Sequence, residues 1–141
     1  MKKKIQFDKE KMAAIAKKHG LVFVVLFGSK ARGEKPNAES DLDIAVLAKK
    51  DLSYKQYMNV HSMIADLFSG QNADVRLLND TDLLFQHNVV RDGILLFGNH
   101  EEYKTYKRLI VRRYVDDGEI YFPMLDRLVF KQQEELERKI L

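Results

Sequence analysis

The chain has 141 residues, 24 of them basic and 21 acidic, and its formal net charge of +3 is only weak evidence for a nucleic-acid partner. This length predicts one domain with a buried core, and the absence of cysteine excludes disulfides and thiolate chemistry and fits a reducing, cytoplasmic location. No apolar run approaches the roughly 20 residues of a membrane span, and no signal-peptide core follows the basic start, so no membrane partner is expected.

Hydrophobic periodicity predicts helices that alternate with short strands. Helices are expected at residues 7–19, 53–69, 79–92, 99–116 and 124–141, and strands at residues 21–27, 41–47, 73–78 and 94–97. Asp8 and Gly20 are placed to begin and end the first helix, and Ser53 with Gln56 forms a capping box for the second. Asn79 or Asp80 is expected to cap the third helix.

These elements predict an α+β domain, with a small mixed sheet of three to four strands packed by helices and with C-terminal helices. One domain is expected over residues 1–141, with a core at about 8–98 and a helical extension at about 99–141. Two readings stay open for the apolar and tyrosine stripes of the last two helices. They either pack against the sheet or form a surface for a partner, because sequence cannot distinguish exposed stripes from buried ones.

A pair of carboxylates lies at the start of the second predicted strand. Asp41 and Asp43 stand two residues apart, so their side chains point to the same face of the strand. Two anions held this closely repel each other unless a cation lies between them, and Mg²⁺ with oxygen ligands is the simplest candidate. A surface Asp-x-Asp turn is the alternative, and it is weakened by the apolar strand and glycine turn around this pair.

The turn before these carboxylates carries the complementary chemistry. Gly28 and Gly33 can adopt positive φ, Ser29 adds a hydroxyl, and successive N–H groups in such a turn form a nest for anions. A Walker A loop is rejected, because Glu34 stands where that motif needs lysine. Phosphate on the turn and metal on the carboxylates together indicate chemistry on a nucleoside triphosphate.

Asp74 lies inside a predicted strand, where aspartate is disfavoured. One reading makes it a third metal carboxylate beside Asp41 and Asp43. The other pairs it with Arg76 or with a turn.

The residues Gly28-Ser29, Ala31-Arg32-Gly33 and Ser40-Asp41-x-Asp43 resemble the signature of the minimal nucleotidyltransferases of the DNA polymerase beta superfamily. Eleven residues separate Ser29 from Asp41, one more than the usual ten. The resemblance implies a polymerase beta-like fold, ATP as substrate and two Mg²⁺ ions as cofactors.

The same resemblance implies roles for the site residues. Asp41 and Asp43 touch both ions, whereas Asp74 touches the catalytic ion and helps to take the acceptor proton. The nucleotide-binding group is Gly28, Ser29, Arg32 and Ser40. Arg32 either pairs with phosphate or braces the loop.

Similarity extends through Ala73-Asp74-Val75 and Asp92-Gly93-Ile94-Leu95 to the tyrosine-rich helix, and over this range the chain resembles the MNT antitoxins, which partner HEPN toxins. The resemblance implies transfer of AMP from ATP to a tyrosine of the toxin. The toxin's own Arg-x4–6-His motif is absent, so this chain would be the antitoxin. Two alternatives remain, which are stoichiometric neutralisation of the toxin without catalysis and adenylylation of a small molecule.

Overall fold

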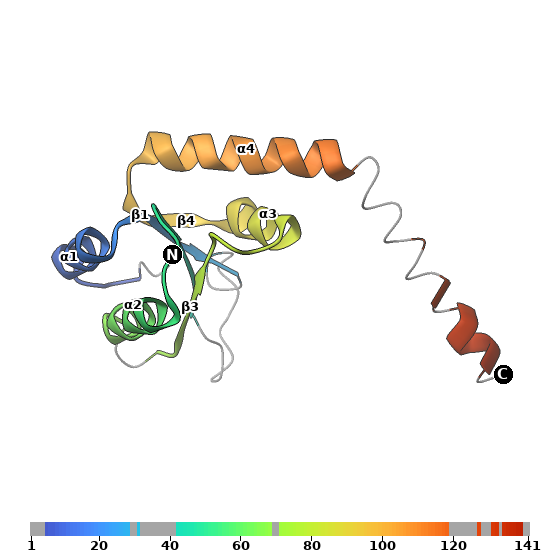
Figure 1. Ribbon diagram of the computed structural model, residues 1–141, viewed down its shortest axis with the longest axis horizontal. Helices are drawn as coiled ribbons and strands as arrows, with labels where there is room; N and C mark the ends of the chain where they lie inside the picture. The colour runs from blue at the N-terminus through green and yellow to red at the C-terminus, as the bar shows by residue number, and fades with distance from the viewer. Residues whose placement is uncertain are drawn as a thin grey trace.

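The computed structural model describes residues 5–28, 31, 42–68, 71–118, 127, 131–132 and 134–139. Eight elements follow one another (Figure 1): α1 (Lys9–His19), β1 (Leu21–Phe27), β2 (Leu42–Ala48), α2 (Tyr54–Asp66), β3 (Ala73–Leu77), α3 (Leu83–Asp92), β4 (Ile94–Gly98) and α4 (His100–Gly118). Of the helix predicted at 124–141, the described residues 127, 131–132 and 134–139 are helical, and the others lie outside the described residues.

The four strands form one mixed sheet in the order β3-β2-β1-β4. β1 runs antiparallel to both β2 and β4, whereas β2 and β3 are parallel. The parallel pair needs a crossover connection, and α2 supplies it. This arrangement confirms the predicted α+β class with a small mixed sheet.

Helices cover both faces of the sheet (Figure 1). α1 and α2 pack on one face, where Met12, Ile64 and Ile44 are fully buried. α3 and α4 pack on the other face around Phe23 and Val89. Strand alternation divides the sheet residues between these two clusters, which explains why β1 is apolar throughout.

Three predicted helix ends are confirmed. The side chain of Asp8 accepts a hydrogen bond from the N–H of Lys11, and Gly20 ends α1 in the left-handed region at φ 65°. The capping box of Ser53 and Gln56 begins α2. That helix ends at Asp66, before the predicted end at 69, because the chain turns at Leu67.

The predicted cap of the third helix is wrong. Asp82 is the N-cap of α3, and its carboxylate accepts a hydrogen bond of 2.8 Å from the N–H of Phe85. The side chain of Asn79 instead bonds to both the N–H and the C=O of Ala48, at 2.9 and 2.7 Å. Asn79 thereby pairs with the end of β2 as a further backbone residue would, and its helix-capping preference is overridden by this tertiary contact.

The tyrosine stripe of α4 packs against the sheet. Tyr103 and Ile110 are buried, and the rings of Tyr103 and Tyr106 contact Phe23 edge-on with centroids 5.3 and 5.2 Å apart. Of the two readings left open for α4, packing is therefore the one that the structure supports for these side chains.

Tyr106 offers a test of this packing. Its hydroxyl is buried without a hydrogen-bond partner among the described residues, and burial raises its pKa to about 12. Because the folded pKa exceeds the unfolded value of about 10, the stability due to the neutral phenol is present below pH 10 and is lost as the pH rises towards 12. We expect Tyr106→Phe to increase the free energy of unfolding at pH 7 by about 1 kcal/mol and to weaken the loss of stability above pH 10.

Denaturant unfolding at pH 7 and pH 11 measures both effects. The exposed Tyr54→Phe is the control and should change neither value. A destabilised Tyr106→Phe would mean that the hydroxyl has a partner in solution.

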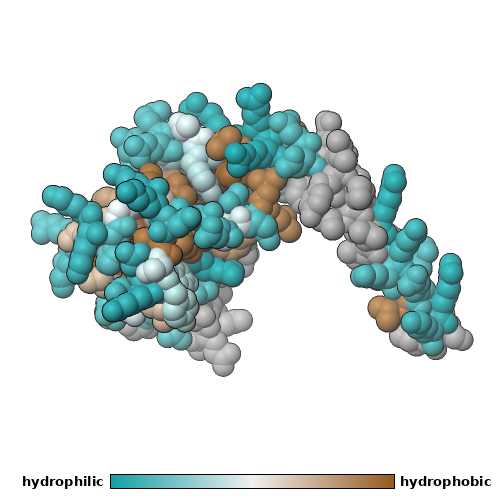
Figure 2. Space-filling model, in the orientation of Figure 1, coloured by the Kyte–Doolittle hydropathy of each residue, from teal (hydrophilic) through white to brown (hydrophobic). Residues whose placement is uncertain are grey.

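The surface is largely hydrophilic, with apolar side chains visible near α3 and α4 (Figure 2). The large exposed apolar residues of these two helices are Leu84, Leu109, Val111 and Val115. No helix in the described part of the chain is both long and apolar enough to cross a membrane.

Candidate active site

Two of the predicted carboxylates lie side by side at one end of the sheet. Asp43 on β2 is paired in register with Asp74 on the parallel strand β3. Neighbouring strands are about 4.8 Å apart, and residues paired in register point to the same face. Asp43 is partly buried and the side chain of Asp74 is 52% exposed, so the pair opens to solvent.

The glycine turn at the end of β1 lies against the same carboxylate. Phe27 is paired with Asp43, and Gly28 follows at φ 79°, where side chains are strained. A Cβ at Gly28 would overlap the carboxylate of Asp43. Both the backbone conformation and the space around it therefore require glycine at this position.

The register thus sets Phe27, Asp43 and Asp74 in one row across β1, β2 and β3. Gly28, the residue after Phe27, lies against the carboxylate of Asp43, so three predicted residues come together here. The other predicted site residues, Ser29, Arg32, Ser40 and Asp41, lie outside the described residues.

The alternative that pairs Asp74 with Arg76 is not what the described residues show. The two side chains contact other residues, since the guanidinium of Arg76 lies over the ring of Phe85 and Asp74 faces His61. Phe85 in turn contacts Phe27 edge-on, with ring centroids 5.6 Å apart. The sequence offered Arg76 as a partner of Asp74 but did not predict its contact with Phe85. A contact between the start of a helix and a distant strand leaves no local sequence pattern.

α2 borders the carboxylates on their outer side. Nε2 of His61 lies 3.9 Å from Oδ1 of Asp74, and the ring of His61 contacts that of Tyr57. The hydroxyl of Tyr57 donates a hydrogen bond of 2.6 Å to the C=O of Val75, and burial together with the Asp74 carboxylate raises the pKa of Tyr57. His61 is thereby half-buried beside Asp74.

Asp43 and Asp74 offer the hard oxygen ligands that Mg²⁺ prefers, and the side chain of Asp74 is open to solvent. Within the described ranges, no group of three or more histidine, aspartate or glutamate side chains is arranged to hold a metal ion. A binding set of three carboxylates therefore depends on Asp41, and the two described members fit such a set in residue type and position.

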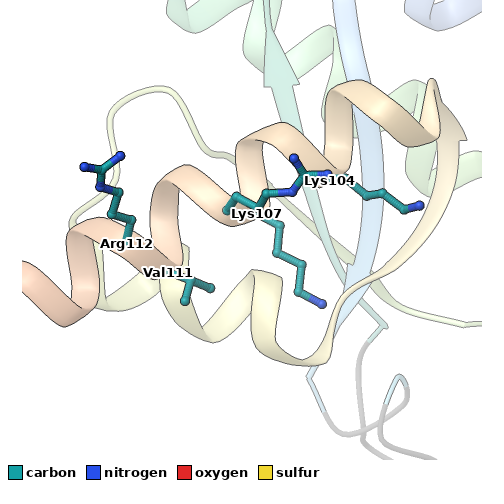
Figure 3. Close-up of a pocket in the computed structure, with 5 residues that line it drawn as sticks. Lys104, Lys107, Val111 and Arg112 are labelled. Atoms are coloured by element: carbon teal, nitrogen blue, oxygen red, sulfur yellow. The ribbon is translucent and has the colours of Figure 1, made fainter.

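A hollow of about 360 Å³ lies elsewhere, along α4 (Figure 3). It is lined by Lys104, Lys107, Arg108, Val111 and Arg112. Four cations would repel a divalent metal ion, and none of the predicted site residues lines this hollow, so it is not the predicted metal site.

Comparison with known proteins supports the same interpretation of the fold. A family model described as polymerase beta, nucleotidyltransferase matches residues 10–102. No curated protein matches the sequence.

Among solved structures, a chain of a toxin–antitoxin complex with AMP-PNP superposes with a TM-score of 0.71 at 21% identity, over 86% of this chain and 98% of that one. A chain of the complex between the tri-AMPylated Shewanella oneidensis HEPN toxin and MNT antitoxin superposes with a TM-score of 0.66 at 20% identity, over 86% of this chain and 95% of that one. At these identities the likeness shows the fold alone, and together with the family model it confirms the polymerase beta-like nucleotidyltransferase architecture that the motifs predict.

Proposed function

Because the chain belongs to the polymerase beta nucleotidyltransferase family, we propose that it transfers AMP from ATP to a tyrosine hydroxyl of a partner HEPN toxin and so acts as an antitoxin. The observation that carries the proposal is the pairing of Asp43 with Asp74 on neighbouring strands, with the Gly28 turn lying against Asp43. The solved complexes with a similar fold, one with AMP-PNP and one with an AMPylated HEPN toxin, support the choice of donor and acceptor.

The turn after β1 and the carboxylates of β2 and β3 have different roles in this proposal. The backbone N–H groups of the Gly28 turn and the hydroxyl of Ser29 bind the β- and γ-phosphates, with Arg32 and Ser40 completing the loop that holds the nucleotide. Asp41, Asp43 and Asp74 would hold two Mg²⁺ ions, which, when bound, supply neutralisation of the charge on the triphosphate and on the leaving pyrophosphate.

The transfer balances as a single displacement. The tyrosine oxygen of the acceptor forms a bond to the α-phosphorus of ATP, and the bond from that phosphorus to the oxygen bridging to the β-phosphate breaks. Pyrophosphate leaves with the electron pair, and the tyrosine proton passes to the carboxylate of Asp74. The exposure of Asp74 at the sheet edge suits it to this role, because a protein acceptor can reach it.

The test is the mass of the acceptor. The purified chain is incubated with the HEPN toxin proposed as its partner, ATP and Mg²⁺, and the intact mass of the toxin is measured. We expect the added mass of one AMP or a ladder of AMP units, together with loss of the ribonuclease activity that the family resemblance implies for such a toxin. A HEPN protein that is inhibited but unmodified would identify a stoichiometric binder instead. An unmodified protein with ATP consumed only when a small-molecule acceptor is supplied would indicate adenylylation of that molecule.

A further inference from the structure

A second row of residues lies directly behind the carboxylates on the same face of the sheet. Val25 lies two residues before Phe27 on the antiparallel β1, and Ala45 and Arg76 lie two residues after Asp43 and Asp74. The register pairs Val25 with Ala45 and Ala45 with Arg76. Val25 and Ala45 are fully buried, whereas Arg76 is exposed. This second row therefore ends in an exposed cation on the edge strand β3, two residues from Asp74.

The ring of Phe85 packs against the guanidinium of Arg76. The N–H of Phe85 is fixed by the Asp82 cap at the first turn of α3, and its ring lies 4.8 Å from the guanidinium carbon of Arg76. The ring is itself held edge-on by Phe27 at an interplanar angle of 89°. A guanidinium stacked on an aromatic face keeps its N–H donors and its second face available.

The position of Arg76 assigns it to one side of the reaction. Gly28, whose turn binds the donor phosphates in the proposed function, lies on β1, and Asp43 on β2 separates it from β3. Asp74 and Arg76 both lie on β3, an edge strand that is separated from β1 and its turn by β2. The side of the site that remains for the acceptor is therefore the β3 side.

We propose that Arg76, stacked on Phe85, is a specificity residue for the acceptor, and that its exposed guanidinium face stacks on the phenol ring of the tyrosine that receives AMP. This inference rests on the proposed function, since it names the group that binds the second substrate of that reaction. The guanidinium then lies between the ring of Phe85 and the acceptor ring. The hydroxyl of the acceptor is directed towards Asp74, two residues before Arg76 on the same strand. An aliphatic hydroxyl acceptor lacks the ring and gains nothing from this contact.

Steady-state AMP transfer separates the two substrates. With the HEPN toxin of the proposed function as acceptor, Arg76→Ala is expected to raise the KM for acceptor about tenfold, as loss of a partly desolvated cation–π contact predicts. Arg76→Lys should lose nearly as much, because an ammonium does not stack as the planar guanidinium does. Phe85→Leu should give a smaller rise. Arg91→Ala, which removes an exposed arginine paired with Asp92, is the matched control and should leave the KM unchanged.

Binding of ATP with Mg²⁺, measured by equilibrium dialysis without acceptor, should stay within about twofold of wild type in both Arg76 variants, since the proposal places Arg76 away from the donor. Loss of ATP affinity with an unchanged acceptor KM would make Arg76 a donor-side phosphate ligand and overturn the proposal. Normal kinetics in both Arg76 variants would overturn it as well. If the wild-type chain binds ATP but modifies no tyrosine, the proposed function fails first and this inference fails with it.

Discussion

Asp43→Asn is expected to lower the rate of AMP transfer by at least about a thousandfold, equivalent to roughly 4 kcal/mol of transition-state stabilisation. The carboxylate of Asp43 is central in the site, because it lies against Gly28 and is paired in register with Asp74. Asparagine has nearly the same shape but no charge, so the fold is retained while the attraction for divalent cations is lost. Transfer is followed as incorporation of labelled AMP into the HEPN protein.

The matched control is Asp51→Asn, the same chemical change at an exposed residue outside the site, which should leave the rate unchanged. Association of Asp43→Asn with the HEPN protein should persist. If the variant still silences the ribonuclease without transferring AMP, neutralisation by binding is the better account of the antitoxin. If it transfers AMP at the wild-type rate, the assignment of Asp43 is wrong.

Gly28→Ala is expected to reduce transfer about a hundredfold or more, for two separable reasons. The positive φ of 79° strains any residue with a Cβ, at about 1–2 kcal/mol. The new methyl group would in addition overlap the carboxylate of Asp43, so that either the turn or the carboxylate must move. Displacement of Asp43 lowers the rate even in molecules that remain folded.

Gly20→Ala isolates the first of these reasons. Gly20 also has a positive φ, 65°, but a Cβ there meets no atom within 4 Å. This control should lose stability by about 1–2 kcal/mol and keep its activity. Thermal unfolding and the initial rate of AMP transfer are measured for both variants at a temperature where both are folded. Equal rates in the two variants would show that contact between Gly28 and Asp43 does not matter for the reaction.

Elements of this fold were predictable where the signal is local. The strand Leu21–Phe27, the Asp8 and Gly20 ends of α1 and the capping box at Ser53 were all predicted and are confirmed, because each depends on residues within one turn or one strand. Asn79 was misassigned because its partner, Ala48, is 31 residues away. A capping residue carries the same sequence signal whether it caps a helix or bonds to a distant strand.

The candidate site divides in the same way. The sequence alone determined the residue types of the candidate site, which are two carboxylates at strand spacing, a third on a later strand, and a glycine turn. Only the tertiary structure decided the register that pairs Asp43 with Asp74, the closeness of Gly28 to Asp43, and the stacking of Arg76 on Phe85. The physical reason is that side-chain type and strand parity are properties of the chain itself, whereas register across strands and contact with a helix are set by how the whole core packs.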